Sequence, residues 1–507
     1  MTGALMHHGL ERAAGRLGDR VAVRLGDENW SFADLDGQAN AMARHLRDGG
    51  VACGDRVAVM LANRVELIVA VNAISKLGAA AVMLSPAWKA VEVGHALSLT
   101  APVHAVADGA AAALLGESLG AAHVTDLDDE AALARALDGD RSPLDVSGPS
   151  ESDESVLVFS SGTTGLPKAV RHTHASMGHA TQHWVDALGL GPDDRFQVAT
   201  PPSHILGLLN LFAAASAGAT VRLHRRFDLD AVLEAIESDG ITLEMAVAPI
   251  ALALANHPDL ESFDLSSLRY IMWGATPVTE RVAEIVTERI GVRWLAGYGA
   301  SEVPVIAVNP VDRPEEWRLD SAGLPADRVS LRVVSLESGA ELAPGEIGEI
   351  QVQGPSVMAG YLPDEANADA FHDGWYRTGD VGWIEPEGWV HLTDRSKEMI
   401  KVNGFQVAPA EIESVLHGHP SVLDCAVFGV PDERAGEVPV AAVQIDPDRP
   451  VADGELVALV AESLATYKHL RHLVVVDEIP RLPSGKVLRR TLRDELMPTL
   501  VASGKGH

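Results

Sequence analysis

Cysteine is nearly absent from this chain, which contains only Cys53 and Cys425 in 507 residues. The two are far apart in the sequence, so they form none of the short cysteine pairs that bind zinc. A framework of disulfides is excluded as well, because it needs several closely spaced cysteines. This usage is typical of a reducing compartment, and we expect a cytoplasmic protein.

Positive charge is also scarce. Lys and Arg number 40 against 71 Asp and Glu, which gives a formal net charge of −31. A surface this acidic repels a polyanion, so we expect no nucleic-acid partner. A local exception is segment 465–495, with seven basic and four acidic residues. Only eight basic residues are lysines, and the motifs below contain four of them: Lys168, Lys397, Lys401 and Lys486.

Long apolar runs are rare. The chain does not begin with a basic region followed by an apolar core, so we expect no signal peptide. The longest uncharged stretch is 196–221, which could span a bilayer by length alone. It contains Pro201, Pro202, His204 and Asn210, and a buried strand, loop and helix explain it more simply. We therefore expect no membrane span.

The remaining composition, 47% apolar and 22% charged, is that of an ordinary globular protein of several domains. From residue 29 to 310, short β-rich runs alternate with amphipathic helical patterns, which predicts mostly parallel sheets covered by helices. One predicted helix opens at Ser31, with Asp34 in the capping-box position, and another ends at Gly78. Segment 320–395 has short strands with Gly/Pro turns, which indicates a small β-barrel or antiparallel sheet. A compact α+β module follows Asp394.

The segment FSSGTTGLPKAV, residues 159–170, combines hydroxyls and glycines with a single lysine after a strand-like run. Successive backbone N–H groups in such a turn form an anion-binding nest, and Lys168 adds a point charge for phosphate oxygens. The segment is not a Walker A loop, because its lysine follows proline instead of glycine. A flexible surface loop is the alternative, and the composition favours phosphate binding.

SSGTTGLPKAV resembles the phosphate loop of the adenylate-forming superfamily, which includes acyl-CoA synthetases, 4-coumarate-CoA ligases, luciferases and peptide-synthetase adenylation domains. Further motifs of that superfamily follow in order: GYGASEV at 297–303, WYRTGDVGW at 375–383, DRSKEMIKVNGFQVAPAEIE at 394–413 and PRLPSGKVLRRTLR at 480–493. The resemblance covers roughly residues 25 to 495. The FQVAPAEIE segment resembles the CoA ligases and luciferases more closely than the peptide-synthetase domains, and the chain as a whole resembles the acyl-CoA synthetase and 4-coumarate-CoA ligase branch.

The resemblance implies an α/β fold with a large N-terminal adenylation domain and a small mobile α+β C-terminal domain. The large domain, 1–394, would contain two αβα subdomains at about 1–175 and 176–315 and a β-barrel at about 316–394. The C-terminal domain would be 395–507, with the hinge near 394–397 and Lys397 at the hinge position. The chain would act as a monomer or homodimer.

The resemblance also implies a nucleotide site for ATP and AMP. The residues that would contact the nucleotide are Ser160, Ser161, Thr163, Thr164, Lys168, Gly274, Ala275, Thr276, Tyr298, Gly299, Ala300, Ser301, Asp380 and Arg395. Tyr298 would pack against adenine, and Asp380 would accept hydrogen bonds from both ribose hydroxyls. Glu302 would help to hold Mg²⁺, a hard cation that prefers oxygen ligands.

The implied reaction has two steps: a carboxylic acid first attacks ATP to give an acyl-adenylate and pyrophosphate, and the thiol of coenzyme A (CoA) then displaces AMP. The implied catalytic residues are Lys486, Lys401, Gln406 and His204. Lys486 would serve the first step, and rotation of the small domain would bring Lys401 and Gln406 in for the second. Gly404 and Phe405 would line the CoA channel, and the acyl pocket would include His204, Trp273 and Gly274.

Several alternatives stay open. Ala169 and Ser301 stand where the superfamily has Gly and Thr, so one alternative is a variant that mainly forms the thioester from a supplied acyl-adenylate. Others are a ligase for a carrier protein and a luciferase-like oxygenase, although no residue selects the latter. Histidines 172, 174, 179 and 183 also permit a zinc site, but they lack a nearby acid partner. The sequence does not select one carboxylic acid.

Overall fold

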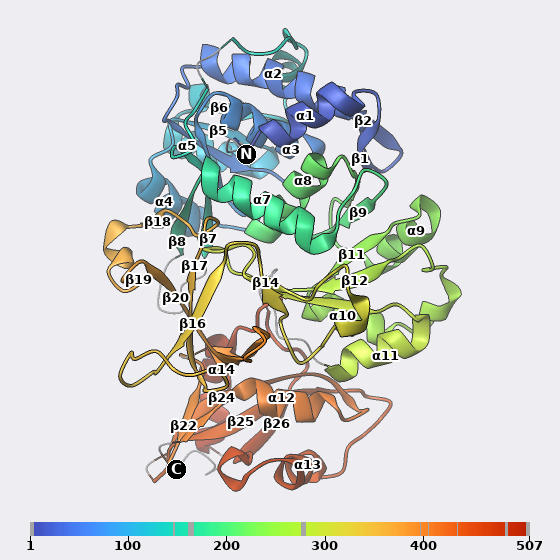
Figure 1. The fold of residues 1–507 in the computed structure, drawn as a ribbon, viewed down its shortest axis with the longest axis vertical. Coiled ribbons are helices and arrows are strands. Elements are labelled where there is room, and N and C mark those ends of the chain that lie inside the picture. Colours follow the sequence, from blue (N-terminus) through green and yellow to red (C-terminus); the bar gives the residue numbers. More distant parts are fainter. Residues whose placement is uncertain are drawn as a thin grey trace.

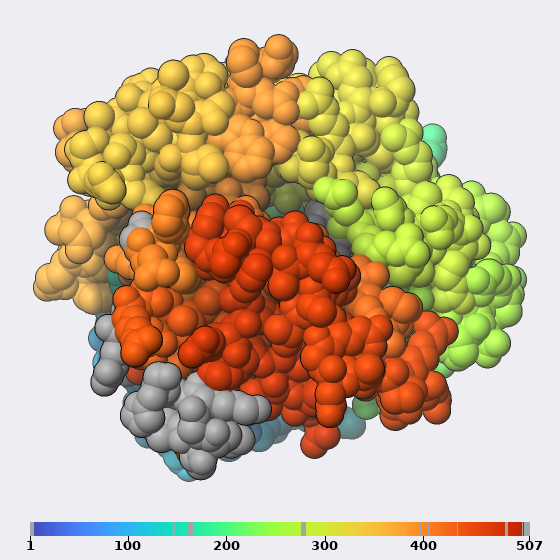
Figure 2. Space-filling model, turned by 90° about the horizontal axis from the view of Figure 1, so that it is seen from below, coloured from blue at the N-terminus to red at the C-terminus, as the bar shows by residue number. Residues whose placement is uncertain are grey.

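The computed structural model describes residues 5–145, 148–160, 167–274, 280–395, 397–403, 405–432, 434–481 and 485–502 of the chain. It shows a large domain built around three sheets and a smaller C-terminal module below it (Figure 1). From below, the C-terminal module, coloured orange to red, lies across the large domain (Figure 2).

The first sheet has seven strands, and its inner strands are parallel. Their order is β18 (Gly360–Leu362), β8 (Lys168–Thr173), β7 (Glu154–Ser160), β4 (Ala80–Met83), β3 (Arg56–Met60), β5 (His104–Ala107) and β6 (Val124–Asp126). The strands β7, β8 and β18 pair antiparallel at one edge, a departure from the predicted parallel pattern. Short sequence periodicity marks these residues as strands but leaves their pairing direction open.

The second sheet has nine strands. Their order is β15 (Leu324–Pro325), β14 (Ala307–Val308), β13 (Trp294–Tyr298), β12 (Tyr270–Trp273), β11 (Leu243–Ala246), β9 (Arg195–Val198), β10 (Thr220–Leu223), β1 (Val21–Leu25) and β2 (Glu28–Ser31). The β1–β2 hairpin therefore differs from its expected place in the 1–175 subdomain, because β1 pairs with β10 of this sheet. Alternation of apolar residues cannot select one sheet edge over another.

Helices cover the two large sheets. They are α1 (His8–Leu17), α2 (Phe32–Asp48), α3 (Val65–Lys76), α4 (Ala90–Thr100), α5 (Gly109–Leu119), α6 (Glu130–Leu137), α7 (His174–Leu188), α8 (Ile205–Ala217), α9 (Leu229–Asp239), α10 (Ala248–Asn256) and α11 (Glu280–Ile290). The predicted capping box is confirmed: Ser31 accepts from the backbone of Asp34, and the Asp34 carboxylate accepts from the backbone of Ser31. Gly78 follows α3 with a φ of 73°, as a helix-ending glycine does.

The predicted Gly/Pro-rich β region contains a five-stranded antiparallel sheet. It orders β16 (Ser330–Val334), β17 (Gly348–Gln353), β20 (Trp375–Ile384) and β19 (Phe371–His372), and β21 (Val390–Arg395) pairs with β20. The pairing of β20 with β21 matters for the site, because it places Asp380 opposite Arg395.

The C-terminal module is mixed α+β. Its strands are β22 (Ile400–Val402), β23 (Phe405–Val407), β24 (Val422–Asp432), β25 (Gly436–Ile445) and β26 (His472–Val475), and its helices are α12 (Pro409–His417), α13 (Glu455–Ser463) and α14 (Arg489–Ala502). Two apolar clusters of its own fill this module. Strand β24 also contacts α10 of the large domain, so the two parts touch in this arrangement.

In the described part of the chain, no helix is long and apolar enough to cross a membrane. The uncharged stretch 196–221 instead forms most of β9, a loop, α8 and the first residues of β10.

Candidate active site

The site lies where the carboxyl ends of the parallel strands meet, the usual ligand position in open α/β sheets. Tyr298 ends β13, and its hydroxyl donates a 2.5 Å hydrogen bond to Oδ2 of Asp380. Nε of Arg395 lies 3.0 Å from Oδ1 of the same carboxylate. Asp380 is only 8% exposed, so its charge depends on these partners. The structure therefore brings together three of the residues predicted to contact the nucleotide.

A second group contains Glu302 and two tyrosines. Tyr361, in β18, donates a 2.7 Å hydrogen bond to Oε1 of Glu302, and its hydroxyl lies 3.3 Å from that of Tyr376. Burial raises the pKa of both tyrosines, so their hydroxyls stay protonated. Nζ of Lys168 lies 5.2 Å from the centroid of the Tyr361 ring. The phosphate-loop lysine and the predicted metal carboxylate thus flank one tyrosine.

Lys486 of the C-terminal module lies near Asp380 and Arg395. Its Nζ lies 3.9 Å from Oε1 of Glu398. Burial lowers the pKa of Lys486, with a further contribution from Arg395, while Glu398 and Asp380 oppose the change. The neighbouring Gly485 packs against Val247 and Pro249 of the large domain. Lys486 is therefore close to Asp380 and Arg395, two residues predicted to contact the nucleotide.

The residues predicted for the second step lie elsewhere. Lys401 and Gln406 are register partners in the β22–β23 hairpin, and both are exposed. Phe405 is 55% exposed, and its ring stacks on that of Tyr467 with a 4.6 Å centroid separation. Lys397 is exposed as well. One module thus carries two sets of predicted catalytic residues, and only the Lys486 set faces the nucleotide site.

The backbone around Tyr298 is tightly constrained. A Cβ on Gly299 would lie 2.1 Å from the carbonyl oxygen of Pro304, so the close approach requires glycine. Ala300 donates its N–H to the carbonyl of Val303. The carbonyl of Ser301 accepts a 2.7 Å hydrogen bond from Nε2 of His172. These contacts fix the loop that presents Glu302.

The residues predicted for the acyl pocket are His204, Trp273 and Gly274. His204 is the N-cap residue of α8 and is half-buried, and burial lowers its pKa, so the imidazole is neutral at pH 7. Gly274 is buried at the end of β12. Trp273 is 1% exposed and packs in an apolar cluster, 5.1 Å from the ring of Trp294. The contact of Trp273 with the acyl group stays a prediction.

Some predicted residues lie outside the described part of the chain: Ser161, Thr163, Thr164, Ala275, Thr276 and Gly404. Ser160 is described and ends β7, where it pairs with Lys168.

Ala169 is a strand residue. It pairs with Phe159 on one side and Leu362 on the other, and it is fully buried. Ala169 is not among the described non-glycine residues that have a positive φ. The methyl group of Ala169 therefore causes no left-handed backbone strain next to the phosphate loop.

The histidines near α7 do not form a metal cluster. His172 contacts Ser301 and Ser176, and Nδ1 of His174 accepts from the backbone of Met6. The guanidinium of Arg328 lies 3.1 Å from Nδ1 of His179. Within the described residues, His7, His8 and Glu11 are the group that could hold a metal ion, but Glu11 already pairs with Lys76 at 2.6 Å.

Sequence reasoning missed Tyr361, Tyr376 and His172. Tyrosine is scarce, with five in the chain, and three of them lie at the site: Tyr298, Tyr361 and Tyr376. That scarcity was the available signal for the tyrosines. His172 gave none, because its role depends on a contact with a loop 129 positions away.

Glu302 is the residue expected to hold Mg²⁺. Glu302 provides one buried carboxylate, with one oxygen already accepting from Tyr361. A single carboxylate suits an ion that takes most of its ligands from nucleotide phosphates and water. The residues therefore fit Mg²⁺ bound together with a nucleotide.

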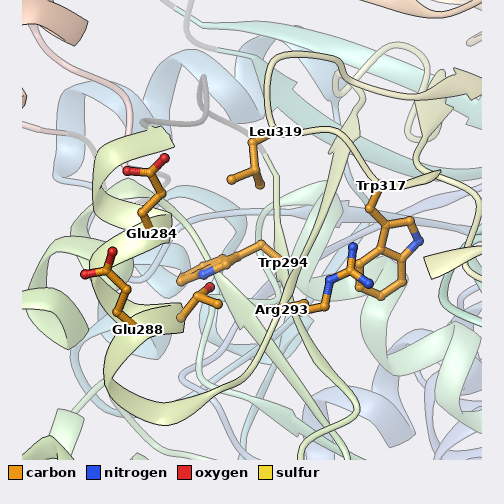
Figure 3. A pocket seen from close by; sticks show the side chains of 7 residues that line it. Glu284, Glu288, Arg293, Trp294, Trp317 and Leu319 are labelled. Atoms are coloured by element: carbon orange, nitrogen blue, oxygen red, sulfur yellow. The ribbon is translucent and has the colours of Figure 1, made fainter. Parts of the chain in front are cut away.

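Two cavities in the described part of the chain lie outside this donor set. One of about 400 Å³ is lined by α11, Arg293, Trp294, Trp317 and Leu319 (Figure 3). It contains none of the predicted site residues, and the Arg293 guanidinium already lies 5.1 Å from the centroid of the Trp317 ring. The second, of about 960 Å³, lies between the large domain and the C-terminal module.

Fold and site together define an adenylate-binding enzyme of two parts. The AMP-binding enzyme family matches residues 10–362, and the AMP-binding enzyme C-terminal domain matches 411–486. The chain therefore belongs to the AMP-binding enzyme family, which confirms the predicted superfamily.

Similar proteins match most of the chain. The chain is 36% identical to 4-coumarate–CoA ligase 2 of Oryza sativa subsp. japonica, over 92% of this chain and 88% of that one. It is 37% identical to feruloyl-CoA synthase of an Amycolatopsis species, over 93% and 95%.

Solved structures share the fold. An anthranilate CoA ligase, AuaEII, bound to anthranoyl-AMP has a TM-score of 0.91 and 26% identity, with 98% of each chain covered. The amide bond synthetase McbA from Marinactinospora thermotolerans has a TM-score of 0.87 and 31% identity, covering 97% of this chain and 99% of that one. The predicted fold class is confirmed.

Proposed function

We propose that the protein is an AMP-forming ligase that converts an aromatic carboxylic acid into its CoA thioester through an acyl-adenylate. The observation that carries this proposal is the position of Lys486 beside Asp380 and Arg395, while Lys401 and Gln406 are exposed on the same module. This division suits an enzyme that performs two reactions in turn at one site.

In the first reaction the residues mainly position and neutralise charge. Asp380 accepts hydrogen bonds from the ribose hydroxyls, and Tyr298 lies against adenine. Lys168 binds phosphate oxygens. The ammonium of Lys486 contacts both the substrate carboxylate and the α-phosphate, and so stabilises the negative charge that develops as the carboxylate oxygen attacks phosphorus. Glu302 would hold Mg²⁺, which would neutralise further phosphate charge.

In the second reaction the C-terminal module rotates near 394–397. The Lys486 loop leaves, and Lys401, Gln406 and Gly404 enter. The CoA thiolate attacks the acyl carbonyl and AMP departs. One contact across the hinge that rotation would break is a 3.1 Å hydrogen bond from the backbone N–H of Ala410 to Oδ2 of Asp394.

The aromatic class of acid is supported by the relatives, whose names specify 4-coumarate, ferulate and anthranilate. A neutral His204 at the start of α8 suits an apolar acyl group. McbA is named as an amide bond synthetase, so an amine is the alternative acceptor. The exposed Lys401–Gln406 hairpin supports CoA as the acceptor.

The test is a panel of cinnamic, benzoic, arylacetic and fatty acids, each assayed for ATP–pyrophosphate exchange and for thioester formation with CoA. We expect exchange and thioester formation with aryl acids. If pyrophosphate exchange occurs but product forms only when an amine is added, the acceptor is an amine and not CoA. Absence of exchange with every acid would overturn the ligase proposal.

A further inference from the structure

The backbone next to Lys486 is held by the side chain of Arg481. Nη1 of Arg481 donates a 2.8 Å hydrogen bond to the carbonyl oxygen of Gly485. Arg481 and Val487 also form an antiparallel bridge, so the chain returns to Arg481 just beyond Lys486. The Gly485 carbonyl belongs to the same planar peptide unit as the N–H and Cα of Lys486. The hydrogen bond from Arg481 therefore fixes the plane from which the Lys486 side chain departs.

Arg481 is itself fixed by a forked ion pair with Asp424 of β24. Its Nε donates to Oδ2 at 2.9 Å, and its Nη2 donates to Oδ1 at 2.8 Å. The two side chains are 15% and 12% exposed, so solvent screens this pair less than it screens a surface pair. A planar guanidinium held by two parallel hydrogen bonds has a fixed orientation. Asp424 thus sets the direction of the third nitrogen, which reaches Gly485.

The Asp424 carboxylate has further partners that keep it in place. The backbone N–H of Cys425 donates to Oδ1 of Asp424 at 2.8 Å, and Nε2 of His417 in α12 lies 3.3 Å from the same oxygen. Burial acts to raise the pKa of Asp424, but its contacts with His417 and Arg481 hold that pKa below its ordinary value. The carboxylate is therefore charged at pH 7, as the fork with Arg481 requires.

Helix α12 also supports the other end of the Lys486 side chain. Both oxygens of Glu413 in α12 accept from Nη2 of Arg489 at 2.8 Å. Nη1 of Arg489 donates to Oε2 of Glu398, whose Oε1 lies 3.9 Å from Nζ of Lys486. The two sets of contacts act on different parts of the lysine. Glu398 faces the ammonium, whereas Arg481 holds the peptide before it.

We propose that Arg481, held by Asp424, is a positioning residue that places the Lys486 ammonium for adenylation. The inference rests on the proposed function, in which Lys486 stabilises charge in the first reaction. A displacement of about 1 Å in a catalytic group can slow a reaction by about a hundredfold, so the orientation of this peptide matters. Arg481 acts through the backbone of Lys486, and its loss should lower kcat of the first reaction while KM for ATP changes little.

The test uses Arg481→Met/Asp424→Asn, which removes the fork and the donor to Gly485 without leaving a buried charge unpaired. We expect kcat of ATP–pyrophosphate exchange with an aryl acid to fall at least about tenfold, with KM for ATP within about threefold of wild type. Thioester formation from synthetic acyl-AMP and CoA should stay within about twofold, because Lys486 serves the first reaction. Arg481→Lys keeps a cation with donors for both partners and should retain most of the exchange rate.

A matched control exists in the large domain. Nε and Nη2 of Arg56 form the same kind of fork with Glu154, at 2.9 and 3.0 Å, and Nη1 donates to the carbonyl of Thr100 at 3.1 Å. Arg56 and Glu154 begin β3 and β7, so they lie at the edge of the sheet opposite the carboxyl ends that form the site. Arg56→Met/Glu154→Gln should lower thermal stability and leave exchange at the wild-type rate.

Each outcome supports or overturns the positioning role. Wild-type exchange in the Arg481/Asp424 double variant would overturn it. Equal losses in the two half-reactions, or an equal loss of exchange in the Arg56/Glu154 control, would also overturn it, because the fork would then act only on stability. Absence of exchange in wild type with every acid would overturn the ligase proposal together with this inference, whereas unchanged exchange in the double variant overturns this inference alone.

Discussion

The hydroxyl of Tyr361 donates a 2.7 Å hydrogen bond to Glu302, and the ammonium of Lys168 lies 5.2 Å from the centroid of the same ring. One side chain from β18 therefore connects the phosphate-loop lysine to the carboxylate expected to hold Mg²⁺. Because β18 pairs with β8, which begins at Lys168, the backbone also ties these groups together. The first predictions concern this link.

Tyr361→Phe removes the hydroxyl and keeps the ring beside Lys168. Glu302 then loses a buried hydrogen bond to a charged group, worth about 1.5–3 kcal/mol. We expect the kcat/KM of ATP–pyrophosphate exchange to fall by roughly tenfold or more, with a higher Mg²⁺ concentration needed for half-maximal rate. A magnesium titration of exchange rate measures both.

Tyr270→Phe is the matched control, because the Tyr270 hydroxyl donates to the backbone carbonyl of Leu188 outside the site. It should lower the free energy of unfolding by about 1 kcal/mol and leave exchange kinetics unchanged. If Tyr361→Phe also changed only stability, the phenol would have no part in the reaction.

Lys401→Ala and Gln406→Ala should separate the two reactions. Both side chains are exposed, so we expect thermal stability within about 0.5 kcal/mol of wild type and normal pyrophosphate exchange. Thioester formation from synthetic acyl-AMP and CoA should slow at least tenfold, because these residues act after rotation. Reduced exchange in either variant would contradict this division.

Glu244 predicts a pH effect on stability. Burial raises its pKa to about 8, against an ordinary value near 4.5, so the folded protein holds this carboxyl neutral. Between those values the unfolded state is ionised and the folded state is not, so stability falls as pH rises, by up to about 1.4 kcal/mol per pH unit. The loss ends once the pH passes the folded pKa.

Glu244→Gln keeps the acceptor for Gln197 and cannot ionise. The stability of wild type relative to this variant should therefore decline between pH 5 and about pH 8. Urea unfolding of both proteins across that range measures the difference. A constant difference would show that Glu244 is charged in the folded protein.

Ala169→Gly tests whether the departure from the superfamily pattern impairs the phosphate loop. Because Ala169 is a buried strand residue, glycine should cost about 1–2 kcal/mol of stability through backbone freedom and a lost methyl contact. We expect no gain in pyrophosphate exchange. A faster exchange rate in the variant would revive the idea of a weakened first reaction.

The sequence predicted much of this architecture because its local signals are strong. The Ser31–Asp34 capping box, the glycine after α3 and the alternation of strands and helices all have short-range causes. The place of the β1–β2 hairpin and the antiparallel β18–β8 edge could not be predicted from pattern, since partner choice depends on three-dimensional packing.

The site shows the same division. Motif order identified Asp380, Tyr298 and Arg395, which the structure brings into contact. Tyr361 and His172 act through contacts between segments distant in sequence, and a single sequence contains no record of such contacts. Lys486 was predicted for the first reaction. It lies near Asp380 and Arg395, and its role in that reaction stays a prediction.

The most direct measurement of the account is the pair of half-reactions in Lys486→Ala. The account predicts that wild type catalyses ATP–pyrophosphate exchange with an aryl acid and that the variant loses it by at least a hundredfold. The variant should still form the CoA thioester from synthetic acyl-AMP at close to the wild-type rate. Loss of both activities, or retention of exchange, would contradict the assignment of Lys486 to the first reaction.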